Sequence, residues 1–209
     1  IRKLVKGNLK TAPRWFVEDG KTILKEAKKK NVVLLSYGDP YIATTHIELR
    51  TRAIMEKIKT KTIHASSAIT SLIGECGLHY YKIGRSVTMM KDQQSASSVY
   101  YTIYENLIAG NHSLIILEYN NDAKFFLNPK NALSNLLLME GEQKRNVIDE
   151  SSFAIVASRI GTTTQKIIAG KISSLKKIDF GKPPHTVIIP GALHFTESYA
   201  LKILAKCLD

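Results

Sequence analysis

The 209-residue sequence contains few of the features that mark secreted, membrane-spanning or disulfide-rich proteins. Its only cysteines, Cys76 and Cys207, lie far apart and imply no disulfide framework, so a reducing cytosol is the expected compartment. The longest apolar runs, such as Val32 to Leu35, fall far short of the roughly 20 residues that a membrane span needs. The opening Ile-Arg-Lys-Leu-Val-Lys-Gly lacks the apolar core and cleavage site of a signal peptide. We therefore expect a cytoplasmic protein without a membrane partner.

Several familiar catalytic and binding motifs are also missing. No Gly-x-Gly-x-x-Gly sequence is present, which argues against an ordinary dinucleotide-binding fold. Gly20 to Thr22 is only a fragment of a phosphate-binding loop, because Trp15 stands where that loop needs glycine. No serine or cysteine lies in a nucleophile elbow, and Cys76 with His79 would need distant partners to hold a metal. We expect no metal site.

Acidic side chains are outnumbered by basic ones. Eighteen Asp and Glu residues against thirty Lys and Arg residues give a formal net charge of +12, which favours acidic partners such as RNA, the ribosome or an acidic protein. Because the cations are spread along the chain, it stays equally open that many lysines, such as Lys28 to Lys30, only solvate helix faces. No aromatic signature of an RNA-recognition motif accompanies them, and DNA is not an expected partner.

Apolar periodicity predicts alternating helices and strands. The expected helices cover residues 17–30, 44–59, 97–109, 128–142 and 195–207, and another begins near Ile69. The expected strands cover residues 31–36, 62–65, 86–90, 113–119, 153–157 and 186–190. This alternation favours an α/β architecture with largely parallel sheets. The least charged break, near Gly84, divides the chain into an N-terminal α/β domain, 1–84, and a C-terminal α/β domain, 85–209.

The most informative local feature is the loop Gly38-Asp39-Pro40. It follows a predicted buried strand and precedes a predicted helix that Thr44 or Thr45 can cap, which is where open α/β sheets commonly bind ligands. Glycine permits close backbone approach, Asp39 offers a charged acceptor and the helix N-terminus offers free amides. A tight turn with a capping aspartate is the alternative that these residues alone leave open.

Six segments resemble successive signatures of the diphthine synthase family. They are Gly38 to His46, His64 to Ser67, Gly77 to Ser86, His112 to Glu118, Ser158 to Gly161, and Pro183 to His194. Each is weak alone, but the set occurs in family order and covers nearly the whole chain. The resemblance implies membership of the wider tetrapyrrole methylase superfamily, with two α/β domains, a cofactor cleft between them and commonly a homodimer.

The resemblance also implies an activity. The chain would be an S-adenosylmethionine-dependent N-methyltransferase with S-adenosylhomocysteine as product. Its substrate would be the amino group of the modified histidine precursor on translation elongation factor 2, in diphthamide biosynthesis. Two alternatives stay open: a sister methylase that acts on ribosomal RNA or a corrin ring, and a non-catalytic basic α/β module that binds RNA.

Carried over position by position, the resemblance implies seven cofactor-binding residues: Asp39, Ile42, Ser67, Ala68, Leu117, Ile160 and His185. Four of these are apolar, so backbone groups and shape would contribute much of the binding. No residue is assigned a catalytic role, although Asp39 or His185 could accept a proton indirectly. Family members begin with a strand and a Gly-Leu-Gly loop that have no counterpart here, so we expect the sequence to be incomplete at its amino end.

Overall fold

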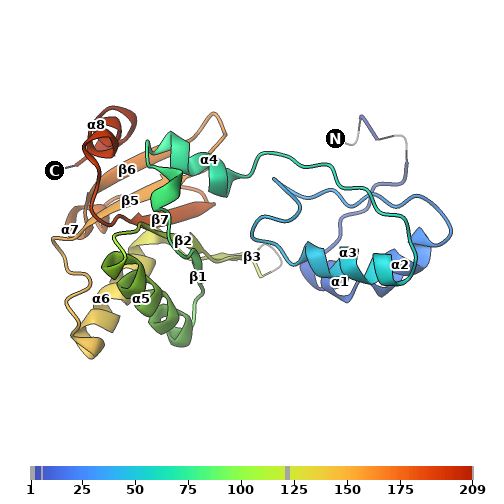
Figure 1. Cartoon of the computed structure of the whole chain (residues 1–209), viewed down its shortest axis with the longest axis horizontal. Helices are drawn as coiled ribbons and strands as arrows, with labels where there is room; N and C mark the ends of the chain where they lie inside the picture. Colours follow the sequence, from blue (N-terminus) through green and yellow to red (C-terminus); the bar gives the residue numbers. More distant parts are fainter. Residues whose placement is uncertain (1–2, 6, 121–122, 209) are drawn as a thin grey trace. The chain divides into compact units, whose positions relative to one another are not determined.

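The computed structural model describes residues 3–5, 7–120 and 123–208, which divide into a unit ending at Ser67 and a unit beginning at Ala68 (Figure 1). The charge pattern predicted the boundary near Gly84 instead. The difference arises because the segment after Ser67 is built into the second unit. The Gly84 N–H donates to the His112 carbonyl at 2.9 Å, the His112 N–H donates to the Lys82 carbonyl at 2.7 Å, and Leu72 is buried in that unit's core.

The second unit is organised around a six-stranded sheet with the strand order β1-β2-β7-β5-β6-β8. The strands are β1 (Val87–Met89), β2 (Ser113–Leu117), β5 (Phe153–Ser158), β6 (Lys166–Lys171), β7 (His185–Ile189) and β8 (Lys206–Cys207). Only β1–β2 and β6–β8 pair in parallel, while β2–β7, β7–β5 and β5–β6 are antiparallel. The expectation of largely parallel sheets is therefore wrong here. For β5 and β6 the reason is the short connection between them, which forms a hairpin, whereas a parallel pair would need a long crossover.

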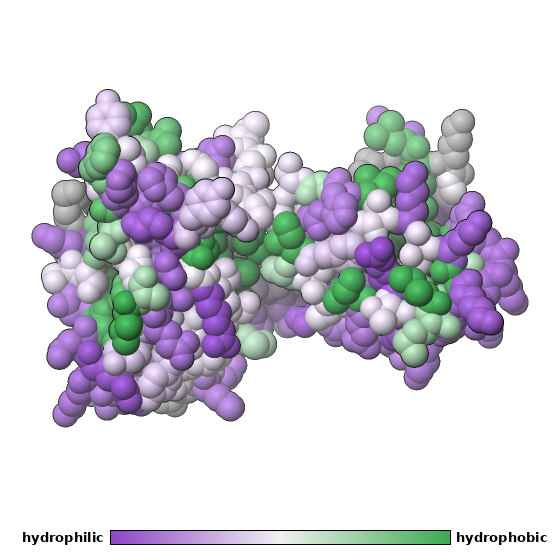
Figure 2. Space-filling view, viewed as in Figure 1, coloured by the Kyte–Doolittle hydropathy of each residue, from purple (hydrophilic) through white to green (hydrophobic). Residues whose placement is uncertain are grey.

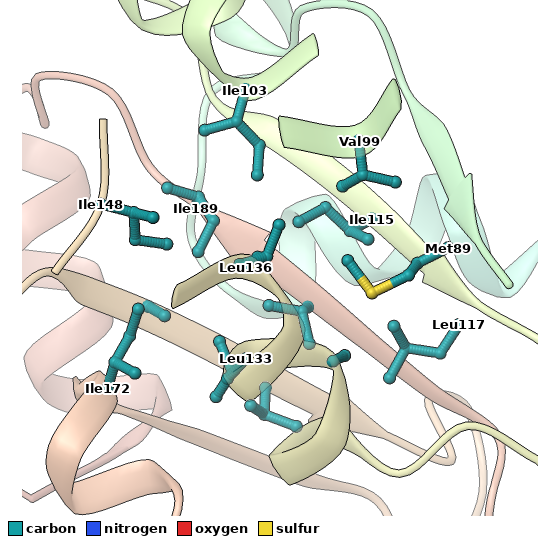
Figure 3. Close-up of a cluster of buried hydrophobic side chains, with 14 of the residues drawn as sticks. Met89, Val99, Ile103, Ile115, Leu117, Leu133, Leu136, Ile148, Ile172 and Ile189 are labelled. Atoms are coloured by element: carbon teal, nitrogen blue, oxygen red, sulfur yellow. The ribbon is translucent and has the colours of Figure 1, made fainter. Parts of the chain in front are cut away.

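Helices cover both faces of this sheet. α5 (Gln93–Ile108), α6 (Pro129–Gln143) and α7 (Ile172–Leu175) share one apolar cluster with the sheet, and α4 (Ala68–Glu75) and α8 (Phe195–Leu204) share the other. Alternation along the strands separates the two clusters: Ile115 belongs to the first, shown in Figure 3, and Leu114 to the second. A 3₁₀ turn (Tyr80–Lys82) and the hairpin β3 (Tyr119–Asn120) with β4 (Phe125–Phe126) complete the unit. The predicted α/β class is confirmed.

Cap residues set several helix boundaries. Asn128 accepts a hydrogen bond from the Lys130 N–H at 2.9 Å, and Pro129 occupies the first turn, so α6 begins as predicted. Asp92 accepts from the Ser95 N–H at 2.8 Å, which starts α5 four residues before the predicted residue 97. The last predicted helix ends early, because residues 206–207 pair with β6.

The described residues of the first unit form three helices: α1 (Arg14–Asp19), α2 (Lys21–Ala27) and α3 (His46–Met55). The single helix predicted over residues 17–30 is two helices, because Gly20 adopts φ 61° and its N–H closes α1 on the Phe16 carbonyl at 3.1 Å. A left-handed residue ends a helix, and glycine takes that conformation at little cost. Across the described part of the chain, no helix is long and apolar enough to cross a membrane.

The strands predicted at residues 31–36 and 62–65 are wrong, since the described residues of the first unit contain no strand. An extended segment becomes a strand only when a neighbouring backbone completes its ladder of hydrogen bonds. The side chains that should have been buried are instead exposed, Val33 by 77% and Leu35 by 54%. In the view of Figure 2, apolar residues of the surface lie scattered among hydrophilic ones.

A buried carboxylate connects four parts of the second unit. Glu197, in the first turn of α8, is fully buried and receives four hydrogen bonds. Oε1 accepts from the His79 N–H at 2.7 Å and from His112 Nε2 at 3.0 Å, and Oε2 accepts from Lys82 Nζ at 3.0 Å and the His194 N–H at 2.8 Å. Burial raises the pKa of Glu197, but these hydrogen bonds outweigh it and lower the pKa to about 2. The group is therefore a buried anion at neutral pH.

His112 extends this network to the end of β7. Its Nδ1 accepts a hydrogen bond from the Gly191 N–H at 3.0 Å, so Nε2 carries the proton that is donated to Glu197. Burial lowers the pKa of His112, which keeps the ring neutral. The network thus joins the residue before β2, the residues after β7 and the start of α8.

Replacing Glu197 should be costly to folding. Glu197→Ala would leave two backbone N–H groups, His112 and Lys82 without their acceptor, and breaking a buried charged network typically costs about 3–5 kcal/mol. Urea denaturation should show that loss in the free energy of unfolding. Glu105→Ala is the matched control, because the Glu105 side chain is 64% exposed and pairs with Arg85 only at 3.9 Å. Its cost should stay within about 0.5 kcal/mol, and an equal cost for the two variants would contradict this role of Glu197.

The contact between the end of α4 and α8 depends on Gly77. Gly77 has φ +69°, and a Cβ there would lie 2.4 Å from the Cβ of Ala200. Gly110 has a similar φ of +72° with open space around it. Gly110→Ala should therefore cost about 1 kcal/mol for the backbone alone, and Gly77→Ala about 2–4 kcal/mol because overpacking adds to it. Thermal and urea unfolding of the two variants check this, and equal losses would refute it.

Candidate functional site

In the first unit the fold brings together two segments that the family resemblance assigned to the cofactor. Gly38 has φ +69°, and a Cβ there would lie 3.5 Å from the Ser66 carbonyl oxygen and 3.6 Å from Ser67 Cα. The Gly38 backbone therefore packs directly against the backbone of Ser66 and Ser67. Asp39 and Ser67 are both buried beside this contact. Glycine is favoured here by the left-handed conformation, while a Cβ would make only ordinary van der Waals contacts.

The Asp39 carboxylate holds this arrangement through three hydrogen bonds. Oδ1 accepts from the Tyr41 N–H at 2.9 Å, and Oδ2 accepts from His64 Nδ1 at 2.7 Å and more weakly from the Ala65 N–H at 3.4 Å. The Tyr41 N–H is the main cause that lowers the pKa of Asp39, and the bonds from His64 and Ala65 add to it against the opposing effect of burial. Asp39 is therefore ionised at neutral pH.

Capping in this loop follows the alternative of a turn closed by the aspartate, since Asp39 accepts from the Tyr41 N–H. Thr45, the N-cap residue of α3, makes no capping hydrogen bond with its side chain. The Thr44 hydroxyl accepts a long hydrogen bond from the His46 N–H at 3.4 Å and donates to the Pro40 carbonyl. Of the other predicted residues, Ile42 is half-buried in the same loop, and Ala68 is the exposed first residue of α4.

His64 is a polar neighbour that was not among the predicted site residues. Its ring contacts Asp39 through Nδ1, lies edge-on to Tyr41 with 5.9 Å between ring centroids, and leaves the side chain 68% exposed. His64 stands 25 residues from Asp39 in sequence. Only its place beside Ser67 in a family-like segment could have drawn attention to it.

In the second unit, strand register places Leu117, His185 and Ser158 side by side across the sheet. Ile116 of β2 pairs with Thr186 of β7, so the next residue of β2, Leu117, lies opposite His185. On the other side of β7, Ser158 of β5 is the direct partner of His185. All three are buried at the same end of the sheet. Leu117 joins the cluster under α5 and α6, while Ile160 packs against the cluster under α4 and α8. The fold thus unites Leu117 with His185 but directs the Ile160 side chain to the other cluster.

His185 is buried with half of its hydrogen-bonding capacity unused. Nδ1 is bonded to the Ser158 hydroxyl at 2.9 Å, whereas Nε2 has no hydrogen-bond partner in the described ranges. The rings of Phe126 and Phe180 lie 6.3 and 6.4 Å from the imidazole, measured between centroids. Burial lowers the pKa of His185, with a smaller contribution from the charge of Arg159 and an opposing one from the backbone of Gly181. An unpaired buried nitrogen of this kind is unusual and calls for a ligand or water partner.

Arg159 fixes the loop that leads into His185. Its N–H donates to the Pro184 carbonyl at 3.0 Å, and its guanidinium donates to the carbonyls of Phe180, at 3.0 Å, and Lys182. Arg159 itself has φ 52°, an uncommon conformation for a residue with a side chain. The Ser158-Arg159 pair was noted in sequence only as part of a motif, because its contacts lie more than 20 residues away.

Among the described residues, no group of three or more His, Cys, Asp and Glu side chains is arranged to hold a metal ion. The polar groups described above are one ionised carboxylate and one exposed imidazole in the first unit, and one neutral buried imidazole in the second. Within its own unit, each of these groups can hydrogen-bond a polar organic ligand.

Comparison with known proteins identifies the family. A family model described as Tetrapyrrole (Corrin/Porphyrin) Methylases matches residues 5–176, so the protein is a tetrapyrrole methylase by fold and sequence. The diphthine synthase of Methanocaldococcus jannaschii is 38% identical over 192 residues, which are 90% of this chain and 74% of that protein. The diphthine synthase of Methanosphaera stadtmanae is 36% identical over 197 residues, 93% and 75% of the respective chains. Within the methylases, the chain belongs to the diphthine synthase family.

A solved structure agrees with this placement. A crystal structure of diphthine synthase superposes with a TM-score of 0.78 at 30% identity, covering 94% of this chain and 74% of that one. The resemblance seen in the sequence motifs is therefore confirmed at the level of both sequence and fold.

The protonation state of His185 can be tested directly. Because burial lowers its pKa from the ordinary value of 6.5, this imidazole should take up a proton at a lower pH in the folded protein than in the urea-unfolded chain. Protons then bind preferentially to the unfolded chain, so stability should fall as pH drops below about 6.5. Ring ¹⁵N shifts followed by NMR across a pH titration check the prediction, and a folded His185 that titrates at or above the pH of the unfolded ring would contradict it.

Proposed function

We propose that this chain is an S-adenosylmethionine-dependent methyltransferase of diphthamide biosynthesis, which methylates the amino group of the modified histidine precursor on translation elongation factor 2. Membership of the diphthine synthase family supports the activity. The observation that carries the proposal is that the fold gathers Asp39 with Ser67, and Leu117 with His185, out of residues that the resemblance assigned to the cofactor.

The residues present fit this cofactor. S-adenosylmethionine combines cationic groups with a neutral adenosyl group that offers nitrogen and hydroxyl partners. The ionised Asp39 favours a positively charged ligand nearby, and the unpaired Nε2 of His185 would be satisfied by a polar atom of the ligand. Leu117 supplies an apolar surface beside it. We propose that both groups of residues, with the backbone near Ile42, Ala68 and Ile160, contact the cofactor.

For methyl transfer, the main task of the protein is to position the substrate amine and the cofactor. When bound, the cofactor supplies a methyl group already activated by the positive charge on sulfur. The chain's residues then need to hold the amine in line and exclude competing water, and such alignment can supply up to roughly 7–11 kcal/mol of the barrier. The net charge of +12 supports docking to a large acidic partner of the translation apparatus. A homodimer and a cytoplasmic location complete the proposal.

Cofactor binding is the first test. Calorimetry of the protein should show heat on titration with S-adenosylmethionine. Asp39→Ala should weaken that binding about tenfold or more, because it removes the carboxylate and the three hydrogen bonds that shape the loop. Asp19→Ala, which removes an exposed pair with Lys21, is the matched control and should bind like the unmodified protein.

Substrate identity requires a second measurement on the same preparation. Elongation factor 2 that carries the aminocarboxypropyl histidine should gain mass in methyl-sized steps after incubation with protein and cofactor. Absence of binding heat would favour the RNA-binding module. Binding with methylation only of ribosomal RNA or a corrin would favour a sister methylase.

A further inference from the structure

The Asp39–His64 pair fixes the protonation pattern of an exposed imidazole. Asp39 is ionised and can only accept hydrogen bonds, so the short 2.7 Å contact requires the proton to be on His64 Nδ1. In the neutral ring the lone pair is then on Nε2. Because the side chain is 68% exposed, that nitrogen is open to other molecules.

A second contact holds the ring in place. Tyr41 presents its ring edge to His64, and the Tyr41 hydroxyl is bonded to Thr62 Oγ1 at 2.6 Å. The Arg50 guanidinium lies 5.5 Å from the centroid of the Tyr41 ring. Among the contacts found in the described residues, the titratable groups that touch His64 are Asp39 and Tyr41, with Arg50 beyond the tyrosine. A carboxylate that orients a histidine through one nitrogen, leaving the other free, is the arrangement of a general base.

We propose that His64 is the catalytic base that accepts the proton of the substrate amine, an inference that rests on the proposed function. An alkylamine arrives at neutral pH mainly as an ammonium ion, which has no lone pair for attack. One N–H proton passes to His64 Nε2, and the freed electron pair of nitrogen forms the new N–C bond. The methyl C–S bond breaks with its electron pair remaining on sulfur. The imidazolium, stabilised by Asp39, returns its proton to water through its exposed face.

The other candidate proton acceptors are less suitable. Asp39 already receives three hydrogen bonds that lower its pKa, so it is a weak base. His185 is buried between two phenylalanines, and its pKa is lowered by that burial. His64 combines a fixed tautomer, a charged partner and access to solvent.

Replacement of His64 with asparagine distinguishes a catalytic role of the imidazole from its structural role in the hydrogen bond to Asp39. In His64→Asn the side-chain amide can still donate to Asp39, but no basic nitrogen remains. Transfer to elongation factor 2 at pH 7 should fall on the order of 100-fold or more, while the affinity for S-adenosylmethionine measured by calorimetry stays within about threefold. The rate of the variant should recover as pH rises and the amine loses its proton unaided. His194→Asn is the control. His194 is the N-cap residue of α8, and asparagine is also a favoured N-cap residue, so this variant should behave like the unmodified protein.

Each outcome decides the proposal. An unchanged rate and pH profile in His64→Asn would overturn it, and so would a parallel loss of cofactor binding, which marks a purely structural role. NMR of the unmodified protein should show the Nδ1–H tautomer of His64, and the Nε2–H tautomer would also overturn it. An unmodified protein that binds cofactor but methylates no elongation factor 2 would instead remove the proposed function on which the role rests.

Discussion

The buried anion of Glu197 is the interaction on which the second unit depends. Placing a carboxylate in the interior costs several kcal/mol unless donors surround it, and here two backbone N–H groups and two side chains do so. Through His112 the same network reaches Gly191, so it fixes the start of β2 against the end of β7. Because a strand pair has one register, fixing one end of β2 and β7 also sets which residues meet at the other end. There Leu117, His185 and Ser158 lie in a row.

Local signals allowed much of the second unit to be predicted. Asn128 with Pro129 marks a helix start by chemistry that acts within three residues, and apolar runs such as that of β2 mark buried strands. Strand direction is not local: β5 and β7 pair antiparallel although each has the apolar run that also suits a parallel strand. In the first unit, the apolar residues near Val33 satisfied every local criterion for a strand. The structure offers them no neighbouring ladder among the described residues, so pattern and outcome disagree there.

In the candidate functional residues, too, contacts between distant parts of the chain could not be predicted from the sequence. Asp39 and His185 could be named because they belong to family motifs, whereas their partners could not. His64 and Ser158 stand 25 and 27 residues from the groups they orient, and no periodicity connects them. The Ser158 contact follows from the pairing of β5 with β7, and the His64 contact follows from the close packing of Gly38 on Ser66 and Ser67. Hydrogen-bond partners that are distant in sequence, such as these, can be identified only from the folded structure.

The two groups of residues also differ in electrostatic character, and this difference bears on what they can bind. Hydrogen-bond donors lower the pKa of Asp39 and maintain a negative charge, while burial lowers the pKa of His185 and maintains a neutral ring. The first group suits a cationic moiety, and the second suits an uncharged polar one in apolar surroundings. Each environment therefore favours a different kind of ligand group, whatever molecule carries it. An anionic group such as an RNA phosphate would be repelled by Asp39, which argues against RNA binding at the loop of the first unit.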